Sequence, residues 1–137
     1  MKESFPTELG ILTCLMILAA SLWIPYVVGI ATDPSHEEAF ARPAQISNLR
    51  PWVQRAHRAH LNLLEQATPF AVLVLILALM NGFSTLTYWT AIAFFWIRVV
   101  HAAGMISGYA RMPLRPILFS AGWVCTLMMA YAIFAAR

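Results

Sequence analysis

Four long apolar stretches run along the chain, and more polar segments separate them. They cover residues 9–31, 61–80, 85–107 and 116–136, and the first and last contain no charged residue. An α-helix needs about 20 mainly apolar residues to cross a hydrocarbon core about 30 Å thick. Each stretch reaches that length, so the pattern predicts four transmembrane helices.

Two of the three connections between these helices are short. Asn81 and Gly82 form a turn signal, and residues 108–113 lead into the last helix. Short connections join antiparallel neighbours. We therefore expect an all-α membrane protein in which residues 1–137 form a single domain, an antiparallel bundle of four transmembrane helices. The first helix is expected to be retained, because its apolar run is too long for a signal peptide and no small-residue cleavage site follows it.

Composition supports a membrane protein. Of the 137 residues, 61% are hydrophobic and 11% are charged, whereas soluble domains are about 45–50% apolar and about 25% charged. The two cysteines, Cys14 and Cys125, lie in apolar stretches and are interpreted as packing residues. The chain has no zinc-ligand spacing, phosphate-binding loop or nucleotide fingerprint, so we expect no metal and no nucleic-acid partner.

The basic residues predict the orientation of the bundle. Short loops rich in Lys and Arg remain in the cytoplasm. The arginines in and around the first and third connections are Arg42, Arg50, Arg55, Arg58, Arg111 and Arg115. The turn at residues 81–84 has no Lys or Arg. Both termini are therefore expected to face away from the cytoplasm, with the other two connections inside it, where arginines also contact anionic membrane lipid.

The second helix carries a polar stripe. At 100° per residue, Arg55, Arg58, Asn62, Glu65 and Gln66 share a face about 100° wide. A charged side chain at the bilayer centre costs about 2.5–3.5 kcal/mol on insertion scales. The stripe is therefore expected to face protein or a water-filled cleft.

The third helix offers Arg98 and His101 on one face. Glu65 and Arg98 are a candidate ion pair, which would by itself only hold the bundle together, and His101 is either a packing residue or part of a site wall. The arginines left without an acidic partner are Arg55, Arg58, Arg111 and Arg115. Unpaired arginines at a cleft favour an anionic ligand, because the guanidinium fork matches a carboxylate.

These residues resemble the MAPEG family, the membrane-associated proteins of eicosanoid and glutathione metabolism. The strongest match is the motif Arg55-x-x-Arg58-Ala-His60-x-Asn62-x-x-Glu65-x-x-x-Pro69. A second match is Gly108-Tyr109-Ala110-Arg111, followed by Arg115, and residues 39–43 look like the family's first loop. The motifs span about residues 42–120, and the helix count covers the whole chain.

The resemblance implies a homotrimer that binds glutathione at its subunit interfaces, open toward the cytoplasm. It implies that Arg58, Asn62 and Glu65 hold glutathione, and that Arg115 is the catalytic residue that stabilises the glutathione thiolate. The other expected glutathione-binding residues are Arg55, His60, Gln66, Arg98, Tyr109 and Arg111.

The chemistry of such a site is that of an activated thiol. A free thiol with a pKa of about 8.5 is mostly protonated at neutral pH, and the thiolate is the nucleophile. A fixed cation such as Arg115 favours the thiolate. The expected function is a detoxification enzyme, either a glutathione transferase for lipophilic electrophiles or a peroxidase for lipid hydroperoxides, with the second substrate arriving from the bilayer.

Two positions depart from the family pattern. Met105 stands where a tyrosine is expected, which removes one ligand hydrogen bond, and Pro116 stands where prostaglandin-forming members have serine. The alternative is therefore a non-catalytic member that binds glutathione, another anion or lipid. A proton-coupled drug exporter is disfavoured, because the first helix has no carboxylate between Glu8 and Asp33.

Overall fold

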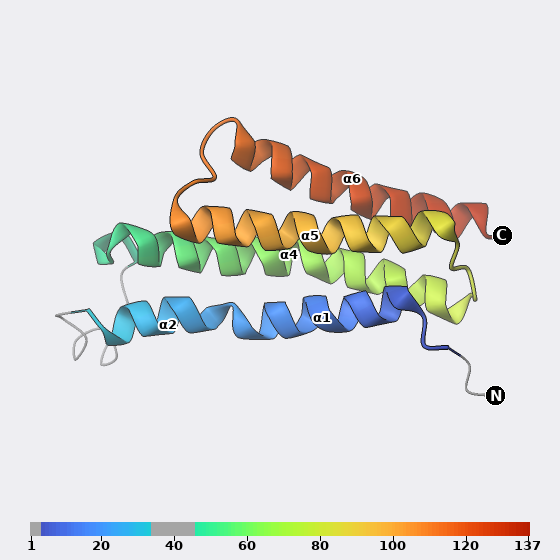
Figure 1. Ribbon diagram of the computed structural model, residues 1–137, viewed down its shortest axis with the longest axis horizontal. Coiled ribbons are helices and arrows are strands. Elements are labelled where there is room, and N and C mark those ends of the chain that lie inside the picture. The colour runs from blue at the N-terminus through green and yellow to red at the C-terminus, as the bar shows by residue number, and fades with distance from the viewer. Residues whose placement is uncertain (1–3, 34–45) are drawn as a thin grey trace.

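The computed structural model describes residues 4–33 and 46–137, so Arg42 and the first-loop motif lie outside the described residues. This part contains four spans long and apolar enough to cross a membrane, Thr7–Ala31, Pro51–Leu79, Thr85–Ser107 and Leu114–Ala135. They lie side by side and alternate in direction, so that α1 begins and α6 ends at the same end of the bundle (Figure 1). The prediction of a multi-pass membrane protein with four spanning helices is confirmed.

The first span consists of two helices, α1 (Thr7–Ser21) and α2 (Trp23–Ala31), which meet at Leu22. Pro25 explains the interruption. It has no backbone N–H, and its ring clashes with the carbonyl four residues earlier, that of Ser21. The hydropathy pattern shows one continuous stretch here and does not reveal the break.

A 3-10 turn, η1 (Ile46–Asn48), leads into the longest helix, α4 (Pro51–Leu79). Pro51 occupies the first turn, where its missing N–H costs nothing. The helix thus begins ten residues before its apolar run at residue 61. The arginine-rich segment is therefore a helical extension of the span, which holds its side chains on defined faces.

The helix α5 (Thr85–Ser107) has well-defined ends. Ser84 and Thr87 form a capping box, in which each side chain accepts a hydrogen bond from the other's backbone N–H. Gly108 ends the helix in the left-handed conformation with φ 82°, which glycine adopts without steric cost. A short connection then leads to α6 (Leu114–Ala135).

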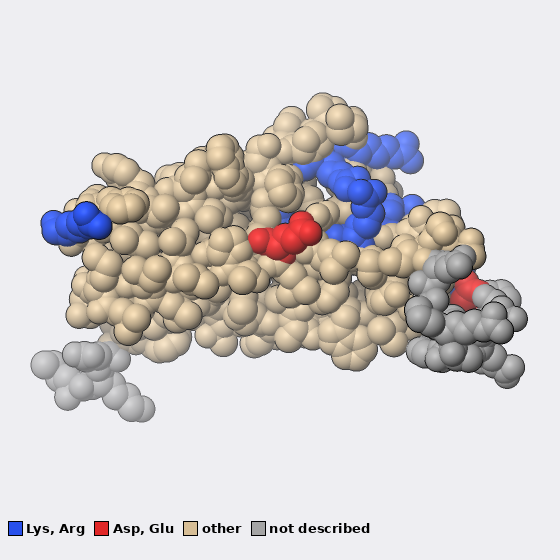
Figure 2. Space-filling model, turned by 180° about the vertical axis from the view of Figure 1, so that it is seen from behind, with Lys and Arg blue, Asp and Glu red and all other residues tan. Residues whose placement is uncertain are grey.

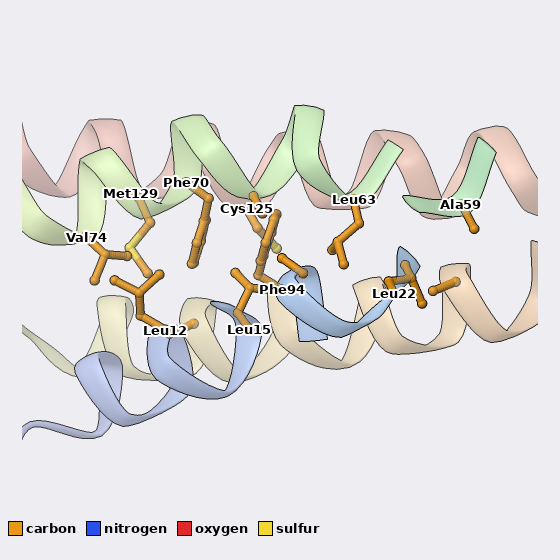
Figure 3. Close-up of a cluster of buried hydrophobic side chains, with 14 of the residues drawn as sticks. Leu12, Leu15, Leu22, Ala59, Leu63, Phe70, Val74, Phe94, Cys125 and Met129 are labelled. Carbon is orange, nitrogen blue, oxygen red and sulfur yellow. The ribbon is translucent and has the colours of Figure 1, made fainter. Parts of the chain in front are cut away.

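One apolar core runs along the bundle between the helices. Phe70 of α4 and Phe94 of α5 stack with ring centroids 3.8 Å apart, and Leu15 and Met129 pack around them, fully buried (Figure 3). Many large apolar side chains, such as Trp89 and Leu79, remain exposed on the outside. In a bilayer these side chains face lipid, so the same fold that would aggregate in water is stable in a membrane.

Candidate functional site

Two neighbouring cavities lie at the end of the bundle formed by the start of α4, the end of α5 and the start of α6. The inner cavity, of about 610 Å³, is lined by Asn62, His101, Arg115 and Phe119 among others. The outer cavity, of about 690 Å³, is lined mainly by Arg55 and by residues 107–111. Basic side chains gather around a hollow in this part of the surface (Figure 2).

The connection from α5 to α6 separates the two cavities, because Ala110 and Arg111 line both. The Ala110 N–H donates to the Gly104 carbonyl at 2.9 Å. A Cβ atom on Gly104 would lie 2.8 Å from that of Ala110, so only glycine allows this close approach. The Arg111 Nε donates to the Gly108 carbonyl at 3.3 Å, which positions its guanidinium beside both cavities.

The predicted polar stripe of α4 is divided between two directions. Three members point into the bundle: the Arg55 guanidinium donates to the Ile106 carbonyl at 3.4 Å, Asn62 lines the inner cavity, and the Gln66 Nε2 donates to a carbonyl of α6 at 2.9 Å. The other two, Arg58 and Glu65, are exposed on the outer face of α4. The prediction that the stripe faces protein or a water-filled cleft therefore holds within the single subunit for Arg55, Asn62 and Gln66, and not for Arg58 and Glu65.

The predicted ion pair between Glu65 and Arg98 is also wrong. Arg98 is fully buried, and its Nη1 donates to the Gln66 Oε1 at 2.8 Å. Its Nη2 lies 3.2 Å from the His101 Nδ1, and its Nε has no partner among the described residues. Neighbouring positions on a helix differ by 100°, and packing against α5 and α6 selects Gln66, not Glu65, as the inward residue.

His101 therefore performs both of the roles that the sequence left open. Because a guanidinium only donates hydrogen bonds, the His101 Nδ1 must accept from Arg98, which places the proton of the neutral ring on Nε2. His101 also lines the inner cavity with Asn62 and Arg115. His101 thus connects the wall of this cavity to the buried Arg98 cation.

Met105, at the position where a tyrosine is expected, contacts Asn62 of the inner cavity. It is buried, and its sulfur accepts a long hydrogen bond of 3.5 Å from the Asn62 Nδ2. A thioether sulfur is a weak acceptor and donates nothing. The departure at this position therefore replaces a hydroxyl with a group that cannot donate to a ligand.

The remaining predicted residues lie at the edges of the site. Tyr109 is 85% exposed beside the outer cavity. His60 is half-buried, and its Nδ1 is buried without a partner among the described residues. Glu65 and Arg58 have no hydrogen bond or ion pair within the described part of the subunit. Arg115, by contrast, faces the inner cavity directly.

Gly122 of α6 is a site residue that no motif indicated. A Cβ atom there would overlap the Gln66 Oε1 and approach the Arg98 Cδ to 3.7 Å. Glycine at this position thus leaves the space in which the amide of Gln66 meets the buried guanidinium.

Gly122→Ala is expected to destabilise the bundle by about 1–3 kcal/mol, because an added methyl group overpacks this contact. Gly10→Ala is the matched control, since a Cβ atom there meets only Phe5 at 3.7 Å. Alanine is the better helix former, so the control is expected to be neutral or more stable by up to about 1 kcal/mol. Thermal unfolding in detergent measures both, and equal effects would contradict the packing of Gly122.

The family model that matches the chain is that of the MAPEG family, over residues 10–135. The match includes the last three spans, all but the first three residues of the first span, and every predicted site residue from Arg55 to Arg115. No curated protein and no solved structure matches the chain significantly.

Proposed function

Because the chain belongs to the MAPEG family, we propose that it is a glutathione-dependent membrane enzyme that activates the glutathione thiol for attack on a lipophilic electrophile or a lipid hydroperoxide. One observation carries the proposal. The two cavities are lined by Arg55, Arg111 and Arg115, and no Asp or Glu lines them within the described part of the chain. Glutathione, with two carboxylates and a thiol that becomes an anion, has the charge that such a wall recognises.

The fully buried Arg98 strengthens the anionic preference. Its contacts, Gln66 and His101, are both uncharged, so its positive charge is not balanced by any described carboxylate within 4 Å. A buried guanidinium interacts strongly with a nearby anion, because the surroundings screen the charge poorly. Together with Arg115 it favours a carboxylate or thiolate in the inner cavity over a neutral ligand.

In the proposed reaction Arg115 stabilises the thiolate in the inner cavity. In the transferase reaction the sulfur forms a bond to an electrophilic carbon of the second substrate. The bond from that carbon to its leaving group breaks, and the leaving group departs with the electron pair. In the peroxidase reaction the sulfur attacks the outer oxygen of a hydroperoxide, the O–O bond breaks, and the alkoxide takes up a proton to form an alcohol. A second glutathione then converts the resulting sulfenic acid into a disulfide and water.

The proposed assembly is a homotrimer in which the outer face of α4 meets neighbouring subunits. This face carries Arg58 and Glu65, and it continues with the exposed apolar side chains of Leu61, Val72 and Ile76. A carboxylate exposed to hydrocarbon is costly. Contact with another subunit and with the amino group of glutathione would remove Glu65 from lipid, so the site would be complete only in the assembly.

The direct test is isothermal titration of glutathione into the detergent-solubilised protein, with an ultraviolet scan for thiolate on the same sample. Binding together with a thiolate signal supports the enzyme. No binding at millimolar glutathione would favour the second candidate, a non-catalytic protein that binds another anion or a lipid headgroup. The contact between Asn62 and the Met105 sulfur favours that candidate, because it offers the ligand no hydroxyl.

Met105→Tyr is expected to raise glutathione affinity by about five- to tenfold, because a hydroxyl restored beside Asn62, which lines the inner cavity, adds about one hydrogen bond to the ligand. Titration calorimetry measures the change. Met105→Phe is the control, since it adds the ring without the hydroxyl. If both variants bind glutathione equally, the residue at this position does not contact the ligand.

A membrane-impermeant arginine reagent is expected to inhibit the proposed enzyme when it is applied from the cytoplasmic side. The positive-inside rule places the inner and outer cavities, here called the arginine cavities, on that side. Peptide mass spectrometry on sealed vesicles identifies the modified residues. Arg55 and Arg111 should react from the cytoplasmic side, and Arg137, at the opposite end of the bundle, from the other side. The reverse pattern would invert the proposed orientation.

A further inference from the structure

A buried carboxylate lies at the opposite end of the bundle, far from the arginine cavities. Glu8, in the first turn of α1, is 5% exposed and accepts a hydrogen bond of 2.7 Å from the Thr87 hydroxyl of α5. Thr87 and Ser107 are separated by twenty residues of one helix, or about 30 Å. Within residues 4–33 and 46–137, no Lys, Arg or His lies within 4 Å of the Glu8 carboxylate.

Glu8 shares a cavity of about 420 Å³, here called the head cavity, with aromatic side chains. The cavity is lined by Glu8, Phe83, Ser84, Thr85, Tyr88 and Trp89. Tyr88 and Trp89 are exposed and meet edge to face, with ring centroids 5.1 Å apart. Aromatic faces attract ammonium groups, and a carboxylate adds direct charge complementarity. This combination is suited to an organic cation and unsuited to an anion.

The head cavity continues into an apolar groove. Thr85 and Trp89 also line a second cavity, of about 320 Å³, which extends between α5 and α6 past Ala93 to Cys125 and Met128. Because α5 and α6 both span the membrane, this tail groove runs from the end of the bundle toward the middle of the bilayer. A mainly aromatic cavity with one carboxylate, which lies at the end of the bundle and opens into an apolar groove, has the shape and orientation of a single membrane lipid.

We infer that this surface is a binding site for a membrane lipid with an ammonium headgroup, such as phosphatidylethanolamine. The ammonium would lie against Glu8 and the rings of Tyr88 and Trp89, and one acyl chain would fill the tail groove. The arginine cavities select the opposite charge at the other end of the bundle, so the two ends would contact different ligands. The inference rests on residues that the proposed glutathione site does not use.

Native mass spectrometry tests the head cavity. The protein is released from micelles that contain equal amounts of phosphatidylethanolamine and phosphatidylglycerol, two lipids chosen with the same acyl chains. Glu8→Gln is expected to lower retained phosphatidylethanolamine about tenfold and to leave phosphatidylglycerol unchanged, because only the charge is lost. Equal retention of phosphatidylethanolamine by the wild-type and variant proteins would overturn the inference. A second test uses the wild-type protein and phosphatidylethanolamine whose amine is acetylated, which removes the positive charge of the headgroup. If the protein retains this lipid as well as the unmodified lipid, the inference is also overturned.

Thr87→Val distinguishes ligand binding from a purely structural contact. It removes the hydrogen bond between α1 and α5 and keeps the Glu8 charge. We expect this variant to retain most of the bound phosphatidylethanolamine, although its melting temperature falls. If Thr87→Val and Glu8→Gln lose the lipid to the same extent, Glu8 only ties α1 to α5 and the inference fails.

Ala93→Phe tests the tail groove, because the larger side chain fills part of it. The expected result is a loss of retained phosphatidylethanolamine of about tenfold, as apolar contact area is removed from the acyl chain. Ala20→Phe, at an exposed position on α1 that does not line the groove, is the matched control and should retain the lipid. Retention by Ala93→Phe at the level of the control would exclude the groove as the acyl-chain site.

Discussion

Arg115→Ala is expected to abolish the glutathione thiolate signal and to lower kcat by at least about 100-fold, the usual effect of removing one preorganised group that stabilises developing negative charge. Arg115 faces the inner cavity beside Asn62 and His101, and no acidic side chain among the described residues lies within 4 Å of it to share its charge. The ultraviolet absorbance of glutathione thiolate and single-turnover kinetics measure the two effects.

The fold should tolerate this substitution, because Arg115 is only half-buried and contributes no side-chain hydrogen bond within the described part of the chain. Arg137→Ala is the matched control: Arg137 lies at the other end of the bundle, over the ring of Phe134, and should not affect the thiolate. Arg115→Lys keeps a point charge without the planar fork and should restore part of the signal. A thiolate signal unchanged in Arg115→Ala would remove Arg115 from the proposed role.

Glu65→Gln is expected to weaken glutathione binding about 10- to 100-fold, because it removes one charged partner of the ligand's amino group. The structure makes this prediction specific. Glu65 has no partner within the described part of its own subunit, so the substitution should leave the secondary structure and the packing of the single bundle unchanged. Titration calorimetry measures the binding, and light scattering on the detergent-solubilised protein measures the assembly.

Gln66→Leu provides the contrast to Glu65→Gln. Gln66 is buried and joins Arg98 to a carbonyl of α6, so its loss leaves Arg98 without its shortest hydrogen bond inside the subunit. It is expected to lower the melting temperature, since an unpartnered buried polar group costs about 1–3 kcal/mol. If Glu65→Gln destabilises the bundle as much as Gln66→Leu does, Glu65 is not the outward-facing residue that the structure describes.

Glu65 and Gln66 are neighbours in the sequence, but we expect their substitutions to affect stability differently. A helical projection of the sequence does not predict this difference. A projection assigns angles on an ideal helix, and the five polar positions fall within one wide sector. The boundary between inside and outside passes through that sector, and it depends on how α4 packs against α5 and α6. The ion pair predicted for Glu65 failed for this reason, and the amide beside it took its place.

The sequence by itself determined the class of protein, the number of spans and the end of the bundle at which the arginines gather. Hydrophobic length and charge placement suffice for these properties, because a bilayer accepts only long apolar helices whose backbone groups are satisfied internally. The turns at Asn81 and Gly108 followed for a local reason, since both adopt positive φ angles that these residues tolerate.

Only the tertiary structure decided which side chains meet. It placed His101 between Arg98 and the inner cavity, showed that Gly122 makes room for Gln66, and divided the polar stripe between the interior and the outer face. It also buried Glu8, which the sequence places just outside the uncharged stretch, against a helix 79 positions away. These contacts join distant segments, and they depend on helix packing, which no local pattern of residues encodes.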